Sequence, residues 1–231
     1  NSFFKYWPDC PYQIYLGSNE STYSDPRVKS ILIGPDRDYS SNLLSMLKKI
    51  NTKWLILWIE DLFLYDRIDN NYISNLMNTA KKNKAGYLKL DVGTPWSFTK
   101  NKKDLVGPLP KGIRYRSGIG LALWNKNTLI KLLIPGESAW EIERNGSKRS
   151  NSFNEPFYSL TPLVRKNPPI KVINSVIKGK WSPNVISFLK KEGYSKLIPH
   201  RKHQSLWSYL YSKAYLFRLD IFRILRKYWY D

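Results

Sequence analysis

Residues 54–61 read WLILWIED and contain the pattern that decides the fold. A run of consecutive apolar residues from Trp54 to Ile59 is followed at once by Glu60 and Asp61. A continuous apolar run of this length is typical of a strand that is buried on both faces, as in a parallel sheet covered by helices. The run therefore predicts an inner strand of an α/β domain, with two acidic side chains at its carboxyl end.

Strand-like and helix-like segments alternate over roughly the first hundred residues. We expect strands at 12–16, 28–33 and 87–90, and helices at 40–49 and 68–81. Further along, we expect helices at 127–133, from 137 and at 182–191, a polar loop at 148–154 and a strand at 170–176. The early alternation predicts a mainly parallel sheet flanked by helices.

The composition indicates an anionic partner. Lys and Arg number 38 against 18 Asp and Glu, so the formal net charge is +20. Such a surplus favours binding of nucleic acid, anionic lipid or a phosphorylated ligand. The single cysteine, Cys10, excludes an internal disulfide. The chain begins at Asn1 rather than Met, and we expect the natural protein to extend beyond this N-terminus.

The acidic pair Glu60-Asp61 is the first candidate site. Open α/β sheets bind ligands beyond the carboxyl ends of their strands. Carboxylates at such a place can hold a divalent cation, Mn²⁺ or Mg²⁺, which in turn holds a diphosphate. The alternative is a structural role, in which the pair caps the next helix or pairs with Arg67.

A second acidic group surrounds Trp140. Residues 135–143 read PGESAWEIE and contain Glu137, Glu141 and Glu143. One of these glutamates is a candidate general base, with Trp140 packed against a sugar. The alternative is a negatively charged first helical turn, in which Glu137 and Glu141 share one face and interact with the helix dipole.

The last segment, Ser205–Trp229, predicts an amphipathic helix. Its apolar face contains Leu206, Trp207, Leu210, Tyr211, Ala214, Phe217, Ile221, Phe222, Ile224, Leu225, Tyr228 and Trp229. Basic and polar residues lie opposite, as in helices that lie on an anionic membrane surface. Docking on the body of the protein or on a second subunit is the alternative. Pro199 divides the chain into a body, 1–198, and this helical tail, 199–231.

Several stretches together resemble one family. They are residues 5–16 (KYWPDCPYQIYL), 57–64 (LWIEDLFL), 120–133 (GLALWNKNTLIKLL), 136–143 (GESAWEIE) and 177–181 (IKGKW). In this order and spacing they are similar to bacterial polysaccharide glycosyltransferases of the GT-A-like class, which build lipopolysaccharide and capsule. The resemblance implies a GT-A-like fold and transfer of a sugar from a nucleotide-sugar donor to a lipid-linked or cell-surface glycan acceptor, at the inner face of the cytoplasmic membrane.

The resemblance also implies roles for single residues. Glu143 becomes the first choice for the catalytic base of an inverting transfer, and Glu141 and Glu137 are the alternatives. The expected donor-binding residues are Asn19, Asp36, Glu60, Asp61 and Trp140, of which Glu60 and Asp61 hold the metal.

Two features depart from the family pattern. At the end of the apolar run 54–59, Glu60-Asp61 stands in place of the family's strict Asp-x-Asp metal motif. The first strand of such a fold is also missing before Asn1. Two other functions compete with sugar transfer. A nucleic-acid-binding protein would explain the charge, although acids at a site repel phosphate unless a cation intervenes. A membrane-associated scaffold that retains the fold without activity is the other.

Overall fold

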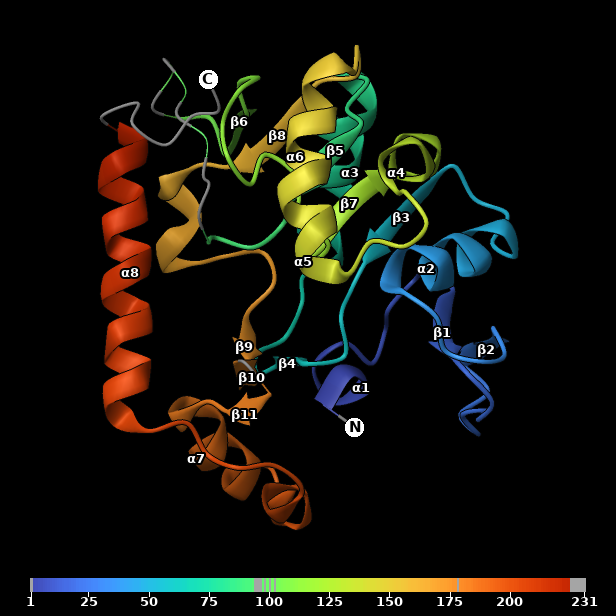
Figure 1. Cartoon of the computed structure of the whole chain (residues 1–231), viewed down its shortest axis with the longest axis vertical. Coiled ribbons are helices and arrows are strands. Elements are labelled where there is room, and N and C mark those ends of the chain that lie inside the picture. The colour runs from blue at the N-terminus through green and yellow to red at the C-terminus, as the bar shows by residue number, and fades with distance from the viewer. Residues whose placement is uncertain are drawn as a thin grey trace.

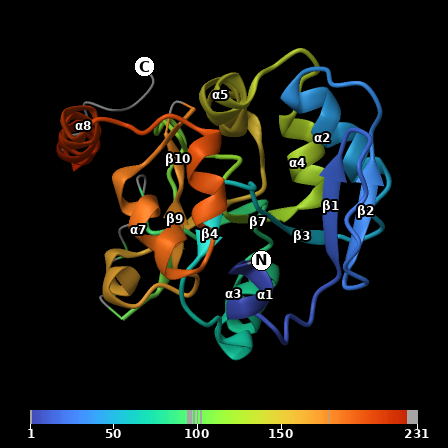
Figure 2. The ribbon, with the colours of Figure 1, turned by 90° about the horizontal axis from the view of Figure 1, so that it is seen from below.

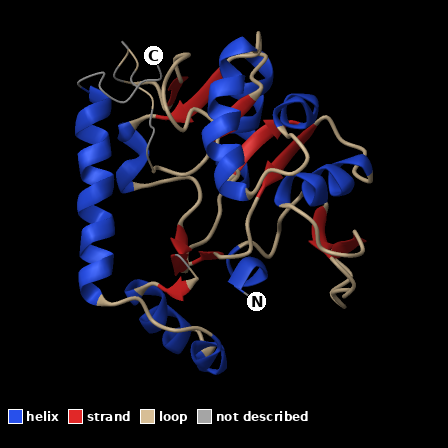
Figure 3. Ribbon diagram, viewed as in Figure 1, coloured by secondary structure: helices blue, strands red, loops and turns tan. Residues whose placement is uncertain are grey.

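The computed structural model describes residues 2–93, 97, 99, 101, 103–177 and 179–224. The protein is a mixed α/β structure built around one central sheet (Figure 1; Figure 3). The sheet contains β3 (Trp54–Leu57), β7 (Ala122–Asn125), β5 (Tyr87–Lys89), β8 (Phe157–Leu160) and β6 (Val106–Pro108), in that order. A mixed α/β fold is thus confirmed.

The prediction of a mainly parallel sheet is wrong. Within the described part of the central sheet, only β5 and β8 pair in parallel, whereas β7 is antiparallel to both β3 and β5, and β6 is antiparallel to β8. The early part of the chain does form a crossover, because β3 and β5 run in the same direction on either side of β7. The antiparallel partner β7 comes from beyond residue 100, so the pattern of the first hundred residues could not predict it.

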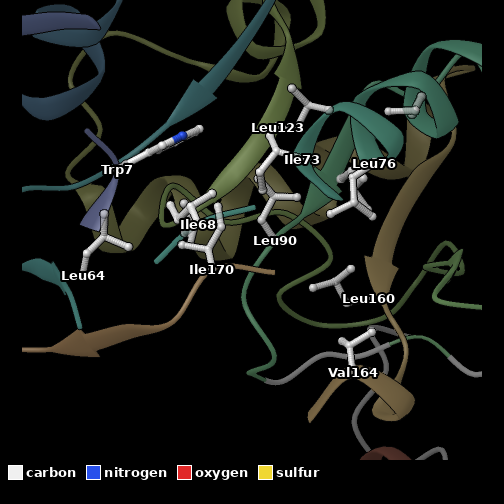
Figure 4. Close-up of a cluster of buried hydrophobic side chains, with 14 residues drawn as sticks. Trp7, Leu64, Ile68, Ile73, Leu76, Leu90, Leu123, Leu160, Val164 and Ile170 are labelled. Carbon is white, nitrogen blue, oxygen red and sulfur yellow. The ribbon is translucent and has the colours of Figure 1, made fainter. Parts of the chain in front are cut away.

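The apolar run 54–59 is explained by helices on both faces of the sheet. Trp54, Ile56 and Trp58 pack against a cluster that includes α3 (Asn70–Lys82), part of which is drawn in Figure 4. The alternate residues Leu55 and Leu57 pack against a second cluster. This second cluster includes α2 (Tyr39–Lys48) and α4 (Lys126–Leu132), which Figure 2 shows on the opposite side of the sheet from α3.

The strand β3 nevertheless lies at the edge of its sheet, not inside it. All of its residues remain partly exposed.

The expected helix at 40–49 is α2, and its cap is Asp38, whose side chain accepts a hydrogen bond from the Ser41 N–H at 2.8 Å. Asp69 caps α3 in the same way. Asx caps of this kind satisfy the first free N–H groups of a helix.

Small sheets and short helices complete the body. They are α1 (Ser2–Tyr6), the parallel pair β1 (Ile14–Ser18) and β2 (Val28–Leu32), the antiparallel pair β4 (Leu62–Leu64) and β9 (Val172–Asn174), the hairpin β10 (Val176–Ile177) and β11 (Lys180–Trp181), and α7 (Pro183–Lys191).

The segment from 139 to 152 is helical almost throughout. It contains α5 (Ala139–Glu141), a π-helical turn (Ile142–Gly146), α6 (Ser147–Arg149) and a 3₁₀ turn (Ser150–Ser152). The polar loop predicted at 148–154 is therefore helical over most of its length. These helical turns place Ser147 and Ser150 in the protein interior, where both are buried. A stretch that looks polar in the sequence therefore packs partly against the core.

The tail forms α8 (Leu206–Ile224), which lies along the outside of the body in both ribbon views (Figures 1 and 2). The side chains of 219–224 and all of Leu225, Tyr228 and Trp229 lie outside the described part. Its described large apolar side chains are exposed, and Trp207 retains 83% of its accessible surface. Among the described residues, no helix is both long and apolar enough to cross a bilayer.

Candidate functional site

The acidic pair Glu60-Asp61 lies in the tight turn between β3 and β4. The turn is closed by the Trp58 indole N–H, which donates to the Leu62 carbonyl at 3.0 Å. The Asp61 carbonyl accepts from the N–H and the hydroxyl of Ser175, at 2.9 and 2.6 Å. The pair is thus held by its backbone, which leaves both carboxylates available to a ligand. No helix begins here, so the capping alternative does not apply.

The Asp61 side chain is half-buried, and its Oδ1 atom has no hydrogen-bond partner among the described groups. Burial raises the pKa of the Asp61 carboxyl, and the charge of the exposed neighbour Glu60 raises it further. Arg67, the other structural alternative, lies instead 3.7 Å from Asp9. A carboxylate oxygen without a protein partner at such a place can accept a bond from water or bind a cation.

Glu143 lies on the π-helical turn that follows α5. Turns of this type widen the helix locally and are frequent at functional sites. Burial raises the pKa of the Glu143 carboxyl, against the opposing effects of the Ile119 N–H, which donates to it, and of the Lys89 charge. A methyl group placed on Gly118 would lie 3.4 Å from Glu143 Oε1 and 3.7 Å from the Tyr87 hydroxyl, so these groups line one small region.

The other two glutamates of this segment are occupied by local structure. Glu137 precedes α5 and binds Arg149 through two hydrogen bonds, of 2.8 and 2.5 Å. Glu141 completes the capping box of α5, where its Oε2 accepts from the N–H of Ser138 at 2.8 Å and from its hydroxyl at 2.6 Å. These hydrogen bonds lower the pKa of both carboxyls. The predicted shared helical face of Glu137 and Glu141 does not form, because the helix begins only at Ala139.

Tyr39 links the two acidic groups. It is the first residue of α2, and burial raises its pKa far above the usual tyrosine value. The charges of Glu60, Glu143 and Asp61 raise it further, so all three carboxylates lie within electrostatic range of this one phenol. The Ser40 N–H donates to the Glu137 carbonyl at 3.1 Å, which fixes the start of α2 against the loop that leads to α5.

The sheet brings a further charged pair to the same place. β3 and β5 are both antiparallel to β7 and therefore run in the same direction. Their carboxyl ends thus lie at the same end of the sheet. Lys89 ends β5, and its buried ammonium group lies 3.1 Å from Asp91 Oδ1 and donates to the Gly93 carbonyl. Both charges act on the carboxyl group of Glu143.

The other three expected donor-binding residues come from the ends of β1 and β2 and from α5. Asn19 follows β1 and donates to the Gly34 carbonyl at 2.9 Å, and Asp36 follows β2 and accepts from the Asn42 amide at 2.7 Å. Trp140 projects from α5 with 69% of its surface exposed. The residues that bring the carboxylates together therefore belong to the turns after β3 and β5, to the start of α2 and to the π-helical turn.

The sequence analysis did not identify Tyr39, Lys89 or Asp91. The signal for Asp91 was available, because it follows the strand predicted at 87–90 just as Glu60 and Asp61 follow the apolar run 54–59. Lys89 lies within that predicted strand. No such signal marked Tyr39, whose role depends on contacts between distant segments. Within the described part of the chain, no group of three or more His, Cys, Asp and Glu side chains is arranged to hold a metal by itself.

Compared with models of known protein families and with curated protein sequences, the chain matches none.

Proposed function

We propose that this protein transfers a sugar from a nucleotide-sugar donor to a hydroxyl group of a lipid-linked or cell-surface glycan. The observation that carries the proposal is the half-buried Asp61 carboxylate at the end of β3, whose Oδ1 atom has no partner among the described groups. Glu60 and Glu143 supply further carboxylates within electrostatic range of the same phenol, that of Tyr39. Sugar transfer requires two kinds of carboxylate: one that engages the diphosphate through a cation, and one that removes a proton from the acceptor. The GT-A-like resemblance of the sequence supports the same assignment.

The acidic pair suits the donor side of the reaction. Asp61 presents a carboxylate oxygen without a partner, and Glu60 beside it is exposed. Hard oxygen ligands of this kind fit Mn²⁺ or Mg²⁺, and two carboxylates leave the other coordination positions for phosphate oxygens and water. A cation held here would neutralise the charge that develops on the departing nucleoside diphosphate. The unpartnered oxygen is the structural reason to place the cation at this pair.

Glu143 suits the acceptor side. A base must take the proton of the attacking hydroxyl as its oxygen bonds to the anomeric carbon and the nucleoside diphosphate leaves. Burial raises the pKa of the Glu143 carboxyl, and a base works best when its pKa lies nearer the working pH. Glu137 and Glu141 are less suited, because each already accepts two or more hydrogen bonds. A dedicated base of this kind is typical of an inverting transfer.

The helix α8 suits a membrane-bound acceptor. Trp207, Leu210, Tyr211, Tyr215 and Phe217 are exposed along it. Exposed aromatic side chains on a strongly basic chain favour the interface of an anionic membrane. We include in the proposal that α8 holds the protein on the inner face of the cytoplasmic membrane.

Donor binding tests this proposal most directly. Thermal unfolding is measured with a panel of nucleotide-sugars and nucleoside diphosphates, with and without Mn²⁺, and with single-stranded nucleic acid as the competing ligand. We expect one nucleotide-sugar to raise the unfolding temperature only when the cation is present. Stabilisation by nucleic acid alone would favour the competing function, and Asp61→Asn, which removes the cation ligand, provides the control that binding occurs at this site.

A further inference from the structure

We propose that a cavity between α1, the small sheet β4–β9 and α7 binds one neutral sugar residue of the glycan acceptor. The cavity has a volume of about 260 Å³. Pockets for drug-sized ligands occupy about 300–1,000 Å³, so this cavity suits a smaller ligand, such as a single sugar ring. Its assignment to the acceptor rests on the proposed function and gives the acceptor a binding place beyond the reacting carboxylates.

Three aromatic side chains from three different elements line the cavity. Tyr6 belongs to α1, Tyr65 follows β4, and Phe188 belongs to α7. The Phe188 ring is buried, with its centre 6.0 Å from that of Phe63, whereas Tyr65 keeps 44% of its surface exposed. The partial negative charge of an aromatic face attracts the C–H groups on the face of a sugar ring. Tyr65 thus offers an accessible surface on which an entering sugar can stack.

The polar lining of the cavity favours a neutral ligand. It comes from α7 and the residue that caps it, and consists of Asn184, Ser187, Lys191 and Glu192. Among the described residues of the lining, Lys191 and Glu192 are the charged ones and carry opposite charges, on a chain whose net charge is +20. Phosphate recognition relies on cationic donors, and a carboxylate repels the anion. Amide, hydroxyl and charged groups beside aromatic rings instead match the hydroxyl-rich edge and the apolar face of a sugar.

The wall between α1 and α7 is held in place by the protein itself. Glu192, at the end of α7, accepts hydrogen bonds from the Tyr6 hydroxyl at 2.9 Å and from the Lys5 ammonium group at 2.6 Å. The Glu192 side chain retains only 3% of its accessible surface. Tyr6 also packs against the buried cluster that contains Phe188. A cavity whose walls are fixed before binding loses little conformational entropy when a ligand enters.

The cavity lies between the acidic pair and the helix α8. Tyr65 is four residues from Asp61, so their Cα atoms are at most about 14 Å apart. On the other side, the Asn184 amide of α7 donates to the Tyr209 hydroxyl of α8 at 2.7 Å, and Figure 1 shows α7 beside the start of α8. An acceptor with its lipid end at α8 and its reacting hydroxyl at the acidic pair would therefore pass this cavity, which makes an inner sugar of the acceptor its expected occupant.

The test measures binding of a panel of monosaccharide methyl glycosides to the full chain, without donor or cation, by saturation-transfer NMR titration. We expect one glycoside to bind, and Tyr65→Ser to weaken its binding about 10-fold, because the stacking surface is lost. Tyr65→Phe should restore most of the affinity, since it keeps the ring. Ser187→Phe should abolish binding, because its ring would occupy the cavity while Tyr65 remains. The unfolding temperature of each variant, measured in parallel, should match that of the parent.

Tyr15→Ser is the matched control, because Tyr15 is a similarly exposed tyrosine, at 37%, on the other small sheet, β1–β2. We expect it to leave glycoside binding unchanged. A parent protein that binds no glycoside, or equal losses from Tyr65→Ser and Tyr15→Ser, would overturn the sugar site, whether or not a nucleotide-sugar binds with Mn²⁺. Glycoside binding that Tyr65→Ser weakens, in a parent that binds no nucleotide-sugar, would support the sugar site and overturn its role in the proposed transfer.

Discussion

Replacement of Glu143 by Gln separates the catalytic proposal from a structural role more cleanly than any other change. Gln has nearly the same shape, and its side-chain carbonyl can still accept the hydrogen bond from the Ile119 N–H. The substitution removes only the ability to take a proton. We therefore expect the fold and donor affinity to be retained while the chemical step is lost.

The expected size of the loss follows from the chemistry of the site. A positioned general base contributes about 10²–10⁴ in rate, which corresponds to about 3–5 kcal/mol in the activation free energy. Glu143 is half-buried, which limits the access of bulk water that could replace it as the proton acceptor. For this reason we expect a loss toward the upper end of that range.

The assay is the initial rate of nucleoside diphosphate release at saturating donor and acceptor, with donor binding measured in parallel. Glu141→Gln is the control, because Glu141 lies two residues away in the same segment and only completes a helix cap. Loss of rate in Glu141→Gln together with full activity in Glu143→Gln would refute the assignment. Full activity in both variants would show that this acidic segment only begins a helix.

The pH dependence of the rate and of stability provides a second test of the role of Glu143. Burial raises the pKa of the Glu143 carboxyl, so the acidic limb of the rate profile should lie above the usual glutamate range. The rate should rise with pH along this limb, whereas the free energy of unfolding should fall. A raised folded-state pKa means that the folded protein binds more protons, so the free energy of unfolding falls as pH rises between the unfolded and folded pKa values. Glu143→Gln should flatten that fall in urea unfolding followed over this window.

Three further predictions address other parts of the molecule. Asp61→Asn should abolish cation-dependent donor binding at an unchanged unfolding temperature, and unaltered binding in calorimetry with Mn²⁺ would exclude the acidic pair as the cation site. Glu137→Gln should break the paired hydrogen bonds to Arg149 and cost about 1–3 kcal/mol of stability, seen as a lower unfolding temperature with normal activity of the folded fraction. Replacing Trp207 and Tyr211 together by Ser should reduce co-sedimentation with anionic vesicles, whereas an equal bound fraction in both proteins would remove α8 as the membrane contact.

Local features of the fold were readable in the sequence because they depend on neighbouring residues. The helix α3 shows apolar spacing and an Asp cap, and the strand β3 is a continuous apolar run. Strand order depends instead on which distant segments pair. The apolar run that ends in Trp124 gave no sign that it would insert between β3 and β5. The apolar run 54–59 made β3 look like a central strand. An edge strand that is packed on both faces, however, shows an identical pattern.

The candidate site was readable in part for the same reason. Glu60 and Asp61 follow an apolar run, and Glu143 ends a local acidic motif, so each could be selected from its neighbours. Their mutual proximity could not be, because it depends on α2 meeting the turn after β3. Nor could the sequence rank the three glutamates by spacing. The structure distinguishes them by their contacts: among the described groups Glu137 forms an ion pair and Glu141 completes a helix cap, whereas Glu143 has neither role.

The electrostatics of the acidic pair are the basis of the proposed cation site. Glu60 and Asp61 repel each other, and burial adds to the cost of ionising Asp61, whose pKa is raised for both reasons. In a chain with a net charge of +20, basic side chains are abundant, yet the Oδ1 atom of Asp61 has no partner among the described groups. Its carbonyl, by contrast, accepts two hydrogen bonds from Ser175. This contrast between an anchored carbonyl and an unpartnered carboxylate oxygen is why we propose that a cation supplies positive charge at the pair.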